Sequence, residues 1–203
     1  AALLLGRLGF TPNGLTLLGF GIAIVAAVLA GAQLWLAAGI VGFVGGVFDL
    51  FDGTLARATG RVSKVGAFMD SVFDRWGEAV AYVGIVVGCV AAGFGLGVGA
   101  GLAAFAMGAA FLVSYVRAKA EGLGFSAGTG MAEVGLAPRE IRLVILTLGL
   151  VLAGTFGGGV GPTHSGGSTW LALALGLIGV LGTITTIQRI IHVRKQAAAS
   201  GGK

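Results

Sequence analysis

Long apolar stretches, separated by short polar or glycine-rich connections, make up most of the 203-residue chain. A helix that crosses a bilayer needs about 20 mostly apolar residues. We expect such helices over residues 12–30, 34–58, 66–91, 96–121, 138–155 and 168–193. Thr11 suits an N-cap and Pro12 the first helical position, so they mark the start of the first helix. The pattern predicts an all-α integral membrane protein with six transmembrane helices, in one domain over residues 1–195 with a disordered tail over 196–203.

The composition supports this interpretation. Hydrophobic residues make up 56% of the chain and charged residues 10%, and the mean hydropathy is +0.99. Soluble domains contain about 25% charged residues, and a water-facing globule of this size could not bury so much apolar surface. The single cysteine, Cys89, excludes an internal disulfide.

The basic residues predict the orientation of the helices. All 13 lysines and arginines fall toward one set of helix ends, whereas the three opposite connections, residues 31–33, 92–95 and 156–167, contain none. Cytoplasmic loops carry an excess of Lys and Arg. We therefore expect a multi-pass protein of the cell (plasma) membrane with both termini cytoplasmic. The net charge of +5 then reflects contact with the membrane surface and membrane lipids, and no nucleic-acid partner is expected.

Four of the eight acidic residues fall within one short stretch. Asp49 and Asp52 are three residues apart near the end of the second predicted helix, and Asp70 and Asp74 are four apart near the start of the third. Each pair therefore shares a helix face. Carboxylates in hydrocarbon are costly and usually mark functional sites. With no Cys or His nearby, they favour a hard cation such as Mg²⁺, Mn²⁺ or Ca²⁺, and four ligands could hold two ions.

Small and basic residues accompany these acids. Gly53, Ala56 and Gly66 leave space for a bulky ligand beside the helices, and Arg57 can neutralise phosphate oxygens. Metal ligands, small residues and arginine together indicate a pyrophosphate-bearing nucleotide at the membrane surface. The alternative is a charge network that only holds two helices together, but four acids so close would repel one another without cations.

Residues 49–74 match the pattern D-x2-D-G-x2-A-R-x8-G-x3-D-x3-D at every defined position, so the chain resembles the CDP-alcohol phosphatidyltransferase family. The resemblance implies transfer of a phosphatidyl group from CDP-diacylglycerol or a related CDP-lipid to an alcohol, with release of CMP. It also implies a homodimer in which the reaction uses two ions of Mg²⁺ or Mn²⁺. It implies metal ligation by Asp49, Asp52, Asp70 and Asp74, with Asp74 as general base. It also implies a CDP site formed by Asp52, Gly53, Ala56, Arg57, Gly66 and Asp70. Direct displacement is expected.

Four further segments resemble the branch of this family that uses inositol 1-phosphate. Residues 70–75 resemble its D-S-x-x-D-R variant, residues 114–121 its S-Y-x-K-A-R-A-E stretch, residues 139–142 its R-P-E-R segment, and residues 188–189 its late Q-R pair. The resemblance implies that the acceptor phosphate is bound by Arg117, Arg139, Arg142 and Arg189. Alternatively, these arginines anchor helix ends to lipid headgroups.

The acceptor stays open between several alcohols. Arg117 stands where that branch has lysine, and Glu140 and Ile141 stand where it has proline and glutamate. Glycerol 3-phosphate, a free polyol or serine therefore compete with inositol 1-phosphate. Outside this reaction, a divalent-cation or proton-coupled transporter would need ionisable residues through the full membrane depth, and the outer halves of the six helices have none. A non-catalytic scaffold would not need the intact pattern.

Overall fold

The computed structural model describes residues 10–60, 62–92, 98–125, 134–157 and 165–200. Within these ranges the side chains of Leu50, Asp52, Ser200 and residues 165–168 are not described. The described residues form six helices and no strand. The helices are α2 (Pro12–Gly31), α3 (Trp35–Ala58), α4 (Lys64–Ala91), α5 (Gly99–Gly122), α6 (Arg139–Phe156) and α7 (Ser165–Ser200). The all-α prediction is confirmed for this part of the chain.

Local capping explains where two of these helices begin. The Thr11 hydroxyl accepts a hydrogen bond from the Gly14 amide at 3.1 Å, and Pro12 follows at the first helical position, as predicted. The Ser63 hydroxyl accepts one from the Gly66 amide at 2.9 Å. Because this cap satisfies an otherwise unpaired amide, α4 begins at Lys64, two residues before the predicted start.

The end of the last helix differs from the prediction. α7 continues through residues 196–200, where a disordered tail was expected, and residues 201–203 lie outside the described part. Three consecutive alanines, residues 197–199, occupy this extension. Alanine has the highest helix propensity, and a helix that is already nucleated extends at low cost.

Four helices are long and apolar enough to span a membrane. They are α2, α3, α5 and the segment Thr169–Ala199 of α7. α4 and α6 do not meet that standard within the described residues, because charged side chains lie in the first half of α4 and in the first turn of α6. Four of these charges, Asp70, Asp74, Arg139 and Arg142, belong to the predicted site.

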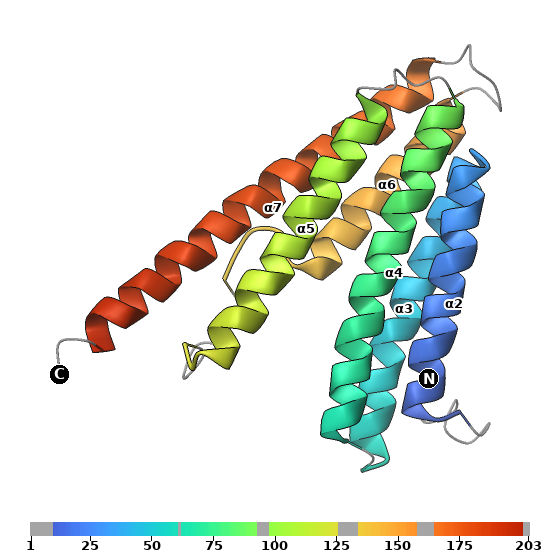
Figure 1. Ribbon diagram of the computed structural model, residues 1–203. Helices are drawn as coiled ribbons and strands as arrows, with labels where there is room; N and C mark the ends of the chain where they lie inside the picture. Colours follow the sequence, from blue (N-terminus) through green and yellow to red (C-terminus); the bar gives the residue numbers. More distant parts are fainter. Residues whose placement is uncertain (1–9, 61, 93–97, 126–133, 158–164, 201–203) are drawn as a thin grey trace.

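The six helices are antiparallel from one to the next, as Figure 1 shows. α2 packs against α3 and α4, α5 packs against α7 and α4, and α6 packs against α7 and α3. The beginning of α2, the α3–α4 connection and the ends of α5 and α7 all lie at the lower end of the view in Figure 1. The sequence-predicted acidic residues lie toward this same end.

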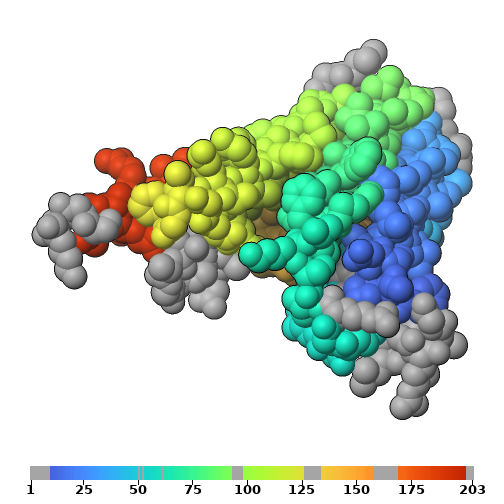
Figure 2. All heavy atoms as spheres, turned by 60° about the horizontal axis from the view of Figure 1, so that its bottom comes forward, coloured from blue at the N-terminus to red at the C-terminus, as the bar shows by residue number. Residues whose placement is uncertain are grey.

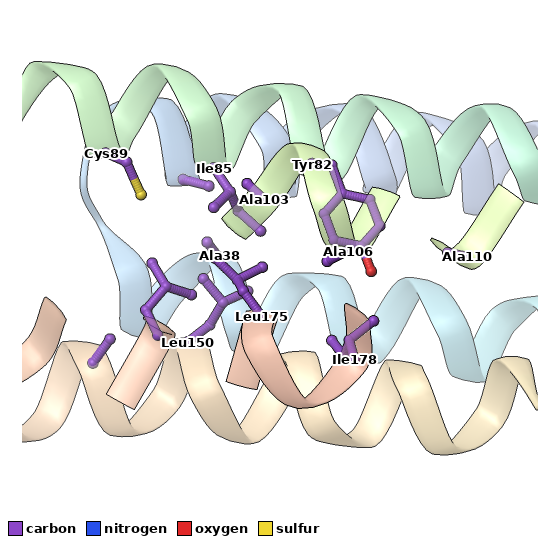
Figure 3. Packing of buried hydrophobic residues seen from close by; sticks show 13 residues of the cluster. Ala38, Tyr82, Ile85, Cys89, Ala103, Ala106, Ala110, Leu150, Leu175 and Ile178 are labelled. Atoms are coloured by element: carbon purple, nitrogen blue, oxygen red, sulfur yellow. The ribbon is translucent and has the colours of Figure 1, made fainter. Parts of the chain in front are cut away.

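The main hydrophobic core lies toward the opposite end and joins all six helices (Figure 3). Alanines supply much of it, including Ala38 of α3 and Ala103, Ala106 and Ala110 of α5. Small residues let helices approach closely. Because the core holds the helices together in one half of the molecule, α5 and α7 diverge from α2, α3 and α4 in the other half (Figure 1).

Two glycines of α4 bring that helix against α2. A Cβ atom added at Gly84 would overlap the carbonyl oxygen of Ala27, and one added at Gly88 would overlap that of Ala30. Backbone atoms cannot move aside as the end of a flexible side chain can. The α2–α4 packing therefore requires hydrogen at both positions.

Gly84→Ala is expected to lower the thermal unfolding temperature in detergent, because it forces α2 and α4 apart at a cost of about 1–3 kcal/mol. Gly108→Ala is the matched control, since nothing lies within 4 Å of a Cβ at Gly108 on α5. The control should keep or slightly raise the unfolding temperature, because alanine favours helix over glycine. Equal stability of the two variants would contradict the packing argument.

Candidate functional site

A single arginine joins the two predicted acidic pairs. The Arg139 guanidinium at the start of α6 donates through Nη2 to Asp49 Oδ2 of α3 at 2.5 Å and through Nη1 to Asp74 Oδ2 of α4 at 2.6 Å. The two aspartate side chains are 17% and 16% exposed. These contacts bring together residues that lie 90 and 65 positions apart in the sequence. Arg139 was expected to bind the acceptor phosphate, and the structure places it on the acids.

Asp49 lies against α2 at Gly19, where the missing Cβ atom leaves room for its carboxylate in the observed position. A Cβ atom at Gly19 would overlap Asp49 Oδ1. Sequence reasoning missed Gly19, since one glycine among 40 carries no distinguishing pattern. The remaining acids lie one turn away along their helices: Asp70 precedes Asp74 on α4, and Asp52 follows Asp49 on α3, although its side chain lies outside the described part.

The donor set fits a hard divalent cation, because every predicted ligand is a carboxylate. Among the described side chains, no three acids, histidines or cysteines are gathered closely enough to form a metal cluster. Instead, the positive charge between Asp49 and Asp74 comes from Arg139. Asp49, Asp70, Asp74 and, by its helical position, Asp52 are the residues that would hold metal.

Of the six residues predicted to contact the nucleotide, all but Asp52, whose side chain lies outside the described part, line one pocket of about 180 Å³. Its walls include Gly53, Ala56, Arg57, Gly66 and Asp70. The first turns of α2 complete it with Pro12, Asn13 and Thr16. The structure thus brings together the small residues, the arginine and one acid of the pattern, and it adds a wall from α2.

A larger hollow of about 550 Å³ lies between α4, α5, α6 and α7, on the face that Figure 2 shows opened between the lower ends of α4 and α5. We call it the basic hollow. All four arginines predicted to bind an acceptor phosphate line it, as does Arg75. Asp70 and Asp74 form part of its wall. Because Asp70 also lines the nucleotide pocket, the two spaces meet at this residue.

The arginines of the basic hollow differ in how they are held. Arg142 and Arg189 are only 2% and 3% exposed. Arg189 donates to the carbonyls of Val113 at 2.6 Å and Val134 at 2.9 Å. Arg117 is largely exposed and pairs with Glu121 at 2.9 Å. Two of the cations are therefore fixed in the wall, whereas Arg117 lies at the rim.

The approach to α6 is fixed by contacts that sequence reasoning missed. The Thr185 hydroxyl of α7 accepts hydrogen bonds from the amides of Leu136 and Ala137, at 3.1 and 3.0 Å. Gly135 has a φ of 125°, which L-residues rarely adopt, and a Cβ there would overlap Thr185. This turn sets the position at which α6 begins and hence the position of Arg139.

Comparison with known proteins identifies related chains of similar length. The family model described as CDP-alcohol phosphatidyltransferase matches residues 10–188. The archaetidylinositol phosphate synthase of Pyrococcus horikoshii is 35% identical over 194 residues, which cover 95% of this chain and 88% of that protein. The phosphatidylinositol phosphate synthase of Cutibacterium acnes is 34% identical, with coverage of 93% and 88%.

A solved structure shares the fold. The crystal structure of phosphatidylinositol phosphate synthase from Mycobacterium tuberculosis with CDP-DAG bound matches with a TM-score of 0.77 at 25% identity, covering 95% of this chain and 90% of that chain. The structure of the same mycobacterial protein in complex with manganese and citrate matches with a TM-score of 0.76 at 24% identity. The arrangement of helices is therefore common to both proteins.

Arg139→Gln is expected to strengthen Mn²⁺ binding in the purified protein by about tenfold, or about 1.4 kcal/mol, because it removes the cation that competes for Asp49 and Asp74. Without metal, the same variant should unfold at a lower temperature than the wild type, since two carboxylates lose their partner. Electron paramagnetic resonance titration of Mn²⁺ and thermal unfolding with and without Mn²⁺ measure these effects. Arg194→Gln, at an exposed position of α7, is the control. Unchanged or weaker Mn²⁺ binding would contradict the competition.

Proposed function

Because this chain belongs to the CDP-alcohol phosphatidyltransferase family, a family of membrane transferases of phospholipid biosynthesis, we propose that its acceptor is inositol 1-phosphate. The reaction transfers the phosphatidyl group of CDP-diacylglycerol, or of a related CDP-lipid, to a hydroxyl of that acceptor and releases CMP. The observation that carries the proposal is that Asp70 lines both the nucleotide pocket and the basic hollow, with Asp74 one turn further along α4 in the wall of the hollow.

The basic hollow supports a phosphorylated acceptor over an uncharged one. Its four predicted arginines and Arg75 come from α4, α5, α6 and α7. Guanidinium groups bind phosphate through paired, charge-assisted hydrogen bonds. The names of the Pyrococcus and Cutibacterium relatives both specify an inositol phosphate product. The same reaction with glycerol 3-phosphate is the alternative, since the hollow would also attract that phosphate.

We place the site at the cytoplasmic surface of the plasma membrane, with all six helices crossing the bilayer and both termini cytoplasmic. α4 has 28 residues and at about 1.5 Å per residue is about 42 Å long, whereas the hydrocarbon core is about 30 Å thick. The excess of about 12 Å equals two turns, so the acids near the start of α4 lie close to the membrane surface. The basic residues at this end of the bundle favour the cytoplasmic side.

The residues of the site divide the chemistry between them. Two divalent cations, Mg²⁺ or Mn²⁺, would neutralise the donor pyrophosphate and the departing CMP. They would be held by Asp49, Asp52, Asp70 and Asp74. Gly53, Ala56, Arg57 and Gly66 hold the CDP moiety. Asp74 takes the proton of the acceptor hydroxyl. The hydroxyl oxygen bonds to the lipid-linked phosphorus, while the bond between that phosphorus and the CMP oxygen breaks. Arg117, Arg139, Arg142 and Arg189 hold the acceptor phosphate.

Exposed apolar side chains on the outer helix faces support a homodimer within the bilayer. They include Val28 of α2, Val83 and Val87 of α4 and Leu173 of α7. The homodimer is expected from the family resemblance, and faces of this kind are where helices associate within lipid. Its oligomeric state would be measured in detergent and in lipid nanodiscs.

Purified protein with CDP-diacylglycerol and Mg²⁺ or Mn²⁺ should release CMP when inositol 1-phosphate is added. Asp74→Asn should lower the rate by about 10²–10⁴-fold, the usual contribution of a general base, whereas Arg194→Gln should keep it. Glycerol 3-phosphate, free inositol and serine are offered separately. CMP release with glycerol 3-phosphate alone would make glycerol 3-phosphate the acceptor in place of inositol 1-phosphate. No release with any alcohol would reject the proposed reaction.

Ala56→Phe should weaken CDP binding by at least about tenfold, or about 1.4 kcal/mol, because its ring would fill much of the nucleotide pocket. Ala104→Phe, at an exposed position of α5, tests the same change in side chain away from both spaces and should leave CDP binding intact. Calorimetric titration with CDP compares the two variants. Equal affinities would show that CDP binds elsewhere.

A further inference from the structure

Glu78 lies behind the wall of the basic hollow and holds two of its arginines. It sits on α4 one turn beyond Asp74 and is not among the residues that line the hollow. Its carboxylate accepts from Arg142 Nε at 3.1 Å, from Arg142 Nη2 at 3.1 Å and from Arg75 Nη1 at 2.8 Å. The Glu78 side chain is 13% exposed. A largely buried carboxylate therefore joins two arginines that line the hollow.

The orientation of Arg142 is fixed from two sides. Nε and Nη2 donate to Glu78, and Nη1 donates to the Ala137 carbonyl at 2.9 Å. A guanidinium has five N–H groups in a rigid plane, so these bonds define the plane and leave one N–H on each terminal nitrogen. With its side chain only 2% exposed, Arg142 cannot turn to find an anion, and its usefulness depends on where Glu78 holds it.

Arg75 extends the same network to a third helix. Its Nη1 atom also donates to the Ser114 hydroxyl of α5 at 2.7 Å, and that hydroxyl donates to the Ala110 carbonyl at 3.1 Å. Glu78 thus connects α4 directly to α6 through Arg142 and indirectly to α5 through Arg75. The connected helices are those that form three of the walls of the basic hollow.

We propose that Glu78 is a positioning residue of the acceptor site, which fixes Arg142 and Arg75 in the geometry that binds the acceptor phosphate. This inference rests on the proposed function and adds a residue that acts through others. Glu78 has no position in the signature of residues 49–74. Its role is to convert two long, flexible cations into a rigid anion-binding wall.

The direction in which Glu78→Gln changes phosphate affinity distinguishes a positioning role of Glu78 from a role in charge balance alone. Glu78 is negative and lies close to the cations of the hollow, so its charge weakens their attraction for an anion. If Glu78 only moderated that charge, Glu78→Gln would tighten phosphate binding. If Glu78 orients the arginines, the same variant loosens phosphate binding although the local positive charge increases.

The experiment compares wild type, Glu78→Gln, Glu78→Asp, Arg142→Gln and the double variant Glu78→Gln/Arg142→Gln. Glu78→Gln is expected to raise the KM for inositol 1-phosphate by about tenfold, or about 1.4 kcal/mol, with the Kd for CDP changed less than about twofold. Glu78→Asp keeps the charge and should recover part of the loss. The double variant should lose less than the sum of the two single losses, because Glu78 acts in part through Arg142.

Binding of inorganic phosphate, measured by calorimetry with the CDP-bound protein, tests the inference independently of the reaction. Loss of phosphate affinity in Glu78→Gln supports the positioning role even if wild type releases no CMP with inositol 1-phosphate, an outcome that rejects the proposed function alone. Unchanged or tighter phosphate binding overturns the positioning role, as does an equal loss of CDP binding. If Glu78→Gln does not fold, the comparison of Glu78→Asp with Arg142→Gln decides the question.

Discussion

Carboxylates within an apolar helical bundle have to be neutralised, and much of this structure follows from how that is done. Removing one partner of a buried ion pair leaves an uncompensated charge that costs several kcal/mol. Here Arg139 joins Asp49 to Asp74, and Arg142 and Arg75 join Glu78. Apart from Arg75–Glu78, which lies within α4, these pairs join α3, α4 and α6, the helices that carry the predicted acids. Charge pairing therefore fixes the relative positions of these helices where apolar packing is sparse.

The apolar packing is concentrated in the other half of the molecule, and this division gives the site its space. The core cluster of alanines and a few larger residues binds all six helices at one end. Toward the acidic end, α4 and α5 move apart and leave the basic hollow between them. A bundle packed tightly along its whole length would have no such space. The glycines of α4 that contact α2 strengthen the closed half without filling the open one.

The sequence was sufficient for those features that depend on neighbouring residues. Apolar length located the six helices, and helical spacing put Asp70 and Asp74 on one face. The role of Arg139 could not be predicted in this way, because its partners lie 90 and 65 residues away and its helix end is equally suited to binding lipid headgroups. Glu78 was visible one turn beyond Asp74, but only the fold shows that Arg142 approaches it from α6. The contacts of Gly19 and Thr185 also depend on packing between distant segments.

The internal cation between Asp49 and Asp74 has a consequence for how such a protein acquires metal. In many small metal-binding domains the ligands repel one another until the ion arrives, so metal binding and folding are one event. Here a guanidinium neutralises the same carboxylates from within the chain, so the helices can assemble before any ion is bound. If these acids hold the metal, as proposed above, the affinity for the ion equals the free energy of replacing Arg139 by that ion. Because Arg139 also lines the basic hollow, its displacement from the acids would make a positive charge available on the side from which a phosphorylated acceptor enters.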